Sequence, residues 1–186
     1  GCPTEYGRMS ELAAQVEAGA GGVLAFLGPG IMDMRTLRMP LGGFLFSLPV
    51  SFSGVDRRCL VRAALENVAY AVKANAAQLA EVGNAPIDGI AVGGGMSCSE
   101  TFVQILADVL GAPVRTFCAT NVTALGAAMC GAAGVGSYSN ILEAATGMAQ
   151  PGPVLVPGRE TVGQYEEHYE RWRMVYDRLQ ELSGEL

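Results

Sequence analysis

The pattern of hydrophobic and polar positions is most regular between residues 56 and 82. Leu60, Ala64, Ala71 and Leu79 recur there at the three-to-four spacing of one helical face, together with Asn67 and Asn75. This pattern predicts a long helix, and Gly83-Asn84 is typical of a helix C-terminal cap.

A second helical pattern lies near the C-terminus, where aromatic residues are separated by spacings of four and three. It consists of Tyr165, Tyr169, Trp172, Tyr176 and Leu179. Charged residues occupy the other positions, so we expect an amphipathic helix whose aromatic stripe packs in the core.

Between these helices the pattern indicates a strand, a turn, a helix and a second strand. Residues 87–92 are a short apolar run that predicts a strand, and 99–110 have helical periodicity. Gly111-Ala112-Pro113 predicts the end of that helix, and 114–118 predict the next strand. A strand–helix–strand unit of this length favours a parallel strand pair.

Weaker patterns predict the remaining elements. We expect a short helix that is capped by Ser10 and ends near Gly19, a strand at 23–27, and a loop over 28–56 with an edge strand at 44–48. Further along, we expect a helix over 123–133, and a helix from a Ser139 cap to Met148.

These elements divide the chain of 186 residues into four regions. Residues 1–55 form a loop-rich opening region, 56–148 the α/β core, 149–164 a Pro- and Gly-rich linker, and 165–186 the last helix. The whole length, 1–186, suits one domain with a core of its own.

Composition excludes several classes of protein. Twelve basic residues against eighteen acidic ones give a net charge of −6, which argues against nucleic acid or a membrane surface as partner. No apolar run is long enough to span a membrane. Five cysteines without a Cys-x-x-Cys motif favour neither a disulfide framework nor a zinc site, and a reducing cytoplasm is expected.

Charged and reactive side chains outside the glycine-rich turn suggest no site. We expect Arg57, Arg58 and Arg62 to form a solvated helix face, and His168 to be a solvated helix residue. Cys130 is expected to be buried in an apolar helix.

The turn Gly93-Gly94-Gly95-Met96 joins the strand over 87–92 to the following helix. Glycine permits positive φ and close approach of a ligand to the backbone, although the same residues also suit a plain tight turn. Ser97 with Glu100 resembles a capping box, and Ser99 is the alternative cap.

Two common nucleotide motifs fit this turn poorly. A dinucleotide fingerprint needs a small residue where Cys98 stands and an acidic residue about 20 positions on. A phosphate loop needs Gly-Lys, but the one lysine is Lys73, in the middle of the long helix. An oxidoreductase with a degenerate fingerprint and bound NAD stays open as an alternative at this point.

A wider set of blocks points to one family. These are RAALENVAY (62–70), IAVGGG (90–95), QILADVLGAPV (104–114), TALGAA (123–128) and GVGSY (134–138). In order and separation they resemble the C-terminal, nucleotide-binding half of the FGGY carbohydrate kinases, the group of the xylulokinases, glycerol kinases and autoinducer-2 kinases.

The resemblance implies an α/β fold of the ribonuclease H-like class, shared with actin, hexokinase and the heat-shock ATPases, with a mixed sheet flanked by helices. It implies that ATP and Mg²⁺ are the cofactors and that the turn contacts adenosine. The residues it assigns to nucleotide binding are Gly93, Gly94, Gly95, Met96 and Ser99, with the Ser99 side chain on the adenine. In the family, the segment matching 123–128 packs between the two halves near the hinge.

The same resemblance leaves catalysis outside this sequence. The family's general base is an Asp in the N-terminal, sugar-binding half, which has no counterpart here, so we assign no catalytic residue and no metal ligand. We expect that half to be the missing partner, the chain alone to be inactive, and the reaction to be γ-phosphoryl transfer to a hydroxyl of a small keto-sugar or polyol. A pentulose such as xylulose is favoured, although the family's Gly-Glu-Arg-x-Pro box is absent from 28–40. The alternative is a free-standing truncated domain with a regulatory or oligomerisation role and no catalysis. A homodimer is a further expected partner.

Overall fold

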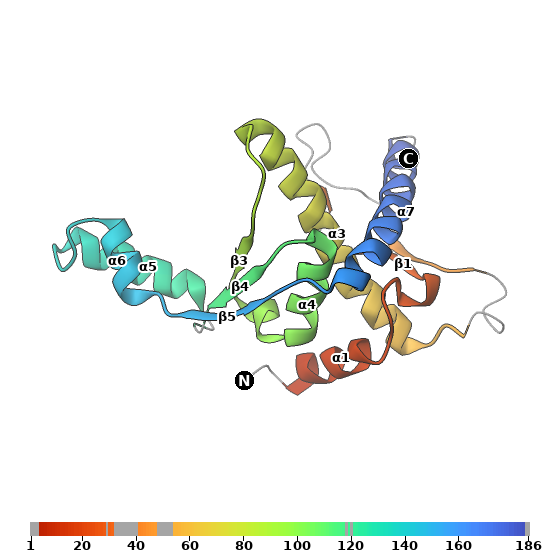
Figure 1. Cartoon of the computed structure of the whole chain (residues 1–186), viewed down its shortest axis with the longest axis horizontal. Helices are drawn as coiled ribbons and strands as arrows, with labels where there is room; N and C mark the ends of the chain where they lie inside the picture. The colour runs from red at the N-terminus through yellow and green to blue at the C-terminus, as the bar shows by residue number, and fades with distance from the viewer. Residues whose placement is uncertain are drawn as a thin grey trace.

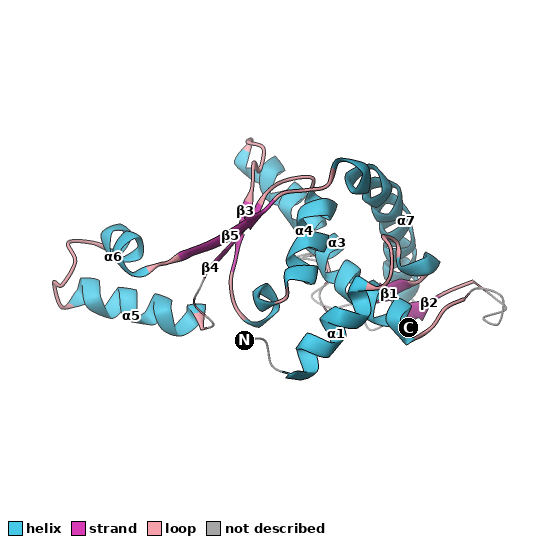
Figure 2. Ribbon diagram, turned by 60° about the horizontal axis from the view of Figure 1, so that its bottom comes forward, coloured by secondary structure: helices cyan, strands magenta, loops and turns pink. Residues whose placement is uncertain are grey.

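The computed structural model describes residues 4–28, 30–31, 41–47, 54–117, 119 and 121–184. Three helices, α3, α4 and α7, pack together beside two small sheets (Figures 1 and 2). The elements follow in the order α1 (Thr4–Ala14), η1 (Ala20–Gly22), β1 (Leu24–Phe26), β2 (Gly43–Leu45), α3 (Arg57–Gly83), β3 (Ile90–Val92), η2 (Gly95–Cys98), α4 (Glu100–Leu110), β4 (Val114–Phe117), α5 (Val122–Gly134), α6 (Ile141–Met148), β5 (Pro151–Leu155) and α7 (Arg159–Ser183).

The predicted long helix is confirmed as α3, and its two ends have clear causes. The Asp56 side chain accepts hydrogen bonds from the backbone amides of Arg58 and Cys59, which otherwise have no partner within the helix. Asn84 takes the left-handed conformation (φ 48°) that ends the helix.

The strands form one mixed sheet and one separate pair. In the larger sheet β4 is central, with β3 parallel on one side and β5 antiparallel on the other. The β1 strand pairs antiparallel with β2 and confirms the strand expected over 23–27, whereas the edge strand expected at 44–48 is shorter, at Gly43–Leu45.

One face of the larger sheet is covered and the other is open. Val114 is fully buried on the side that faces α4, where Ile90 and Leu155 are its register partners. On the other side Ala91, Arg115 and Val154 lie in one register row and are exposed.

The linker predicted over 149–164 is wrong. Residues Pro151–Leu155 form strand β5, and α7 begins at Arg159 rather than at 165. Proline is tolerated in an edge strand, where its missing N–H leaves no ladder bond unmade. The Thr116 hydroxyl donates to the Pro153 carbonyl oxygen at 3.1 Å and fixes β5 against β4.

The N-terminal helix also differs from its prediction. Helix α1 begins at Thr4, and Ser10 lies inside it with its hydroxyl donating to the Tyr6 carbonyl oxygen. Ser10 is therefore not a cap. Most of residues 28–40, where the family's box is absent, lies outside the described residues. Cys118 also lies outside them.

The aromatic stripe of α7 is confirmed as core. Tyr165, Trp172 and Tyr176 are almost completely buried and pack against β1 and α3. The Trp172 ring stacks on Phe26 with centroids 5.9 Å apart, and its indole N–H donates to the Ala25 carbonyl oxygen. This contact attaches the C-terminal helix to the first strand.

Helices α5 and α6 pack on each other and project away from the rest of the molecule (Figure 1). No described residue of α5 is buried, and Cys130 is exposed, so its predicted burial is wrong. Asn140 caps α6 in place of the expected Ser139, whose backbone amide donates to the Glu143 carboxylate instead. Among the described residues, no helix combines the length and the apolar composition needed to cross a membrane.

Candidate functional site

The glycine turn leaves β3, passes through the short helix η2 and enters α4. Gly94 has φ 96° and ψ −170°, a conformation that only glycine adopts without strain. The turn therefore depends on a glycine at this position.

The three glycines have different surroundings. A Cβ at Gly93 would lie 2.5 Å from Cγ1 of Val122, so this glycine allows the start of α5 to pack closely. Within the described part of the chain, and apart from the adjoining residues, no atom lies within 4 Å of a Cβ built at Gly94 or Gly95. The backbone at these two positions therefore faces open space that a ligand can enter.

Ser99, rather than Ser97, caps α4. The Ser99 hydroxyl oxygen accepts the Phe102 amide hydrogen at 3.1 Å, while the Ser97 hydroxyl donates back to the Gly94 carbonyl oxygen at 2.7 Å. The capping box of Ser97 with Glu100 is therefore wrong, and the alternative cap is confirmed. Ser97 instead holds the turn in shape.

A pocket of about 460 Å³ opens beside the turn, a size typical of small-molecule sites. It lies between α1, the middle of α3 and the beginning of α4. Gly95, Met96 and Ser99 line it, whereas Gly93 and Gly94 do not. The other lining residues are Tyr6, Met9, Ser10, Leu27, Ala64, Leu65, Val68 and Phe102.

The chemistry of this lining is apolar with a few polar groups. None of the described lining residues carries a charge, and the hydroxyls of Tyr6, Ser10 and Ser99 are its polar side-chain groups. Such a lining suits a flat, neutral, partly aromatic group better than a phosphate. Tyr6, Met9 and Ser10 were not predicted from the sequence, because the register of α1 against α4 has no local signal.

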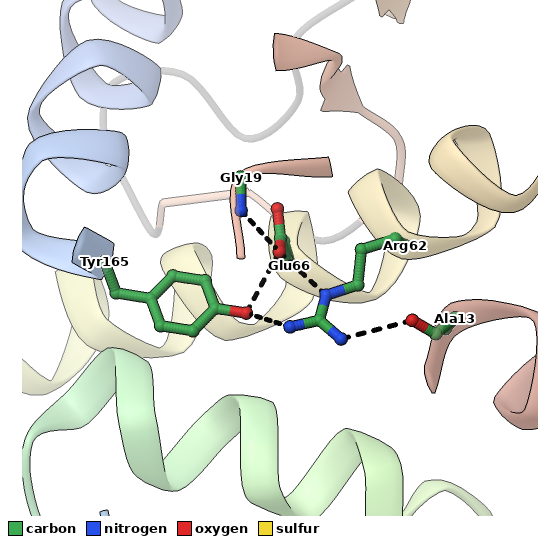
Figure 3. Close-up of polar contacts among 5 residues, drawn as sticks. All are labelled: Ala13, Gly19, Arg62, Glu66 and Tyr165. Atoms are coloured by element: carbon green, nitrogen blue, oxygen red, sulfur yellow. Dashed lines mark hydrogen bonds and ion pairs between the residues drawn. The ribbon is translucent and has the colours of Figure 1, made fainter. Parts of the chain in front are cut away.

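A buried polar cluster fixes α1 against α3 and α7 (Figure 3). The Arg62 guanidinium contacts the Glu66 carboxylate at 2.9 Å, the Ala13 carbonyl oxygen at 3.2 Å and the Tyr165 hydroxyl at 2.5 Å. The same Glu66 oxygen accepts from the Gly19 amide and from Tyr165, each at 3.0 Å.

The sequence predicted Arg62 on a solvated helix face. That prediction is wrong, because the residue is only 9% exposed. Burial raises the pKa of the Glu66 carboxyl, and the Arg62 guanidinium, the Tyr165 hydroxyl and the Gly19 amide counteract that rise only in part. Burial also raises the pKa of Tyr165, which keeps its hydroxyl protonated and able to donate to Glu66. The cluster contacts three helices and holds the α1 wall of the pocket in place.

Two other side chains, His168 and Asp108, do not line the pocket. His168 is half-buried rather than solvated, and its ring packs edge-on to Tyr165 and directly against Gly19. Asp108 accepts from the Gly158 amide at 2.8 Å and from Gln104, so it fixes the start of α7. Within the described ranges, no three His, Cys, Asp or Glu side chains are grouped to hold a metal ion.

Comparison with known proteins agrees with this fold. The sequence matches the FGGY family of carbohydrate kinases, C-terminal domain, over residues 5–135. The chain belongs to this family, and its fold is the ribonuclease H-like α/β fold with a mixed sheet flanked by helices. The alternative of a dinucleotide-binding oxidoreductase is set aside.

The individual relatives and solved structures of similar fold carry the names of kinases. An autoinducer-2 kinase of Yersinia pestis bv. Antiqua (strain Angola) is 29% identical over 92% of this chain and 32% of its own length. The crystal structure of xylulose kinase from Rhodospirillum rubrum is 27% identical, with a TM-score of 0.73 over 96% of this chain and 35% of that one. Plasmodium falciparum glycerol kinase with ADP shares the fold at 16% identity, with a TM-score of 0.73 over 93% of this chain and 33% of that one. The chain thus spans about a third of the length of these relatives.

Proposed function

We propose that this chain is the nucleotide-side domain of a sugar kinase that transfers the γ-phosphoryl group of Mg-ATP to a hydroxyl of a small keto-sugar or polyol. The pocket beside the glycine turn carries this proposal. It would take the adenine base, with Gly94 and Gly95 presenting open backbone to the nucleoside and Met96 and Ser99 contacting the base.

The division of roles within the site follows from the lining. An uncharged, mainly apolar pocket suits adenine, whereas the phosphates would extend out of it toward a second domain. The described residues offer no cluster of carboxylates for Mg²⁺, so we assign this chain no step that involves the metal. Phosphoryl transfer depends mainly on positioning and charge neutralisation, and an amino-terminal sugar-binding domain would supply the base.

The sugar is proposed from the relatives. A pentulose such as xylulose is the first candidate, and autoinducer-2 is the second, because relatives of both kinds match more than nine-tenths of this chain. The compartment we propose is the cytoplasm, since Cys59, Cys98 and Cys130 are free thiols and cytoplasmic conditions keep thiols reduced.

Nucleotide binding by the turn is tested with Gly95→Val. A Cβ at this position meets no atom of the described, non-adjacent residues within 4 Å, so the fold should persist while the branched group projects into the pocket. We expect the dissociation constant for ATP, measured by calorimetric titration up to millimolar ligand, to rise at least tenfold. Gly163→Val, at an equally open position in α7, is the control and should leave it unchanged. Equal ATP affinity in both variants would contradict the proposed site.

Phosphoryl transfer is tested with labelled ATP and a panel of pentuloses, hexuloses, polyols and autoinducer-2. We expect no transfer by the 186-residue chain alone and transfer by a protein that joins it to a sugar-binding half. Transfer by the chain alone would contradict the division of roles. A two-domain protein that phosphorylates none of the panel would contradict the kinase assignment.

A further inference from the structure

Two serine hydroxyls from different helices meet at the wall of the pocket. Ser10 Oγ, on α1, lies 2.7 Å from Ser99 Oγ, the cap of α4, and both residues line the pocket. Ser99 is 9% exposed. The contact joins positions 89 apart in the sequence and has no counterpart in the motif that predicted Ser99.

The neighbouring hydrogen bonds favour one donor for the contact between the two hydroxyls. Each serine hydroxyl has one hydrogen and two acceptor lone pairs. The Ser10 hydrogen is directed to the Tyr6 carbonyl oxygen, 2.9 Å away in the preceding helical turn. With the Ser10 hydrogen assigned to Tyr6, the bond between the serines uses the Ser99 hydrogen, and Ser10 Oγ accepts it.

The remaining hydrogen-bonding capacity of the Ser99 hydroxyl follows from this assignment. One lone pair of Ser99 Oγ accepts the Phe102 amide hydrogen at 3.1 Å. Its hydrogen is directed to Ser10, so one lone pair is left. Toward a ligand, Ser99 is an acceptor and not a donor.

We infer that Ser10 is a specificity-determining residue, which makes the Ser99 hydroxyl select a purine with an amino group at position 6 over one with an oxo group. This inference rests on the proposed function, in which the pocket holds the base. An exocyclic amine donates to the free lone pair, whereas a 6-oxo group places a second acceptor against it. The apolar side chains of Met96, Phe102 and Leu27 leave few groups to compensate the mismatch, and an unpaired polar group in such a site is costly.

Ser10→Ala tests the inference because it removes the acceptor of the Ser99 hydrogen. The Ser99 hydroxyl can then rotate and donate to a 6-oxo group, while its lone pairs stay available to an amine. We expect wild type to bind ATP at least tenfold more tightly than inosine triphosphate. In Ser10→Ala the preference for ATP over inosine triphosphate should fall about five- to tenfold relative to wild type.

Two further variants make the test specific. Ser10→Thr keeps the hydroxyl and should keep the wild-type preference. Ser183→Ala removes a matched hydroxyl-to-carbonyl bond, from Ser183 to Leu179 in α7, and should change neither affinity. Purine riboside triphosphate, which has no group at position 6, should bind equally to wild type and Ser10→Ala. Circular dichroism verifies that each variant is folded.

The outcomes separate this inference from the proposed function. If wild type binds ATP but Ser10→Ala leaves the ratio of the two affinities unchanged, the role of Ser10 is overturned and the nucleotide site stands. If wild type binds ATP and inosine triphosphate equally, the role of Ser10 is likewise overturned. If millimolar ATP does not bind to the 186-residue chain at all, the proposed site is overturned and the inference with it.

Discussion

At the scale of single residues, the most demanding feature is an ion pair inside the molecule. Arg62 and Glu66 are one helical turn apart on α3, and nearly all of both side chains is removed from water. Two charges in such a place are tolerated only when each is paired and hydrogen-bonded. The contacts with Tyr165, Gly19 and Ala13 meet that condition.

Removing the Arg62 guanidinium alone should therefore lower the free energy of unfolding substantially. Arg62→Met leaves the Glu66 carboxylate buried without its counter-charge, and we expect a loss of about 3–5 kcal/mol in the free energy of unfolding. Arg62→Met combined with Glu66→Gln removes both charges and should recover part of this loss. Urea unfolding followed by the fluorescence of Trp172, the single tryptophan, measures both. Equal stability of wild type and Arg62→Met would contradict a buried ion pair.

The same pair predicts a dependence on pH. The pKa of Glu66 is raised above its ordinary value of 4.5, so the folded chain holds this proton at a pH where the unfolded chain has released it. The free energy of unfolding should then fall as pH rises from about 4.5 through the folded-state pKa. We expect a steeper fall in Arg62→Met, and none from this site when Glu66→Gln is added. Urea titrations at pH 5 and pH 8 compare the three proteins, and identical slopes would contradict the prediction.

The role of Arg62 could not be predicted from the sequence for a physical reason. Three arginines begin α3, and their spacing is equally compatible with a solvated face. Only the tertiary position of Tyr165, 103 residues later, decides that one of them is buried. Ser10 is a similar case, because its importance depends on the contact of α1 with α4.

At the scale of elements, strand β5 contains one glycine and two prolines, a composition typical of a linker. A Cβ at Gly152 would lie 2.6 Å from Thr116 Oγ1 and 3.2 Å from the Thr116 backbone. Gly152→Ala should therefore displace β5 from β4 and cost about 1–3 kcal/mol. Gly163→Ala, in the open interior of α7, is the control and should stabilise by up to about 1 kcal/mol. Thermal unfolding measures both, and a neutral Gly152→Ala would contradict the close pairing.

The elements that were predicted correctly are those with local causes. Helix α3 has an Asp cap and an Asn terminator, and α4 has a Ser cap and Gly111 in the left-handed conformation. This same strand–turn–helix unit places the predicted site residues Gly95, Met96 and Ser99 in the lining of the pocket. In contrast, β5 forms because it pairs with β4. The sequence of 149–158 alone contains no sign of that pairing.

At the scale of the whole molecule, the chain has a packed body and an exposed pair of helices, α5 and α6 (Figure 2). Residues 122–142 contain no charged side chain, and Val135 and Leu142 are about four-fifths exposed. An uncharged, apolar surface of this kind is normally covered by another surface. The chain spans about a third of the length of its relatives. We therefore expect a further domain to cover this surface. The family resemblance implies the same for 123–128.

Hydrogen exchange of the 186-residue chain tests this division. Local stability follows the number of buried apolar contacts, and Ala144 is the one described residue of α5 and α6 that is buried. Amides in 122–148 should therefore exchange at least a hundredfold faster than those of α3, α4 and the buried half of α7. Equal protection in both regions would contradict an exposed pair of helices in the single chain.

Repeating the measurement at tenfold higher protein concentration tests which surface packs on these helices. Exchange in 122–148 that slows with concentration indicates a homodimer. Fast exchange that does not change with concentration indicates that a different domain covers the surface.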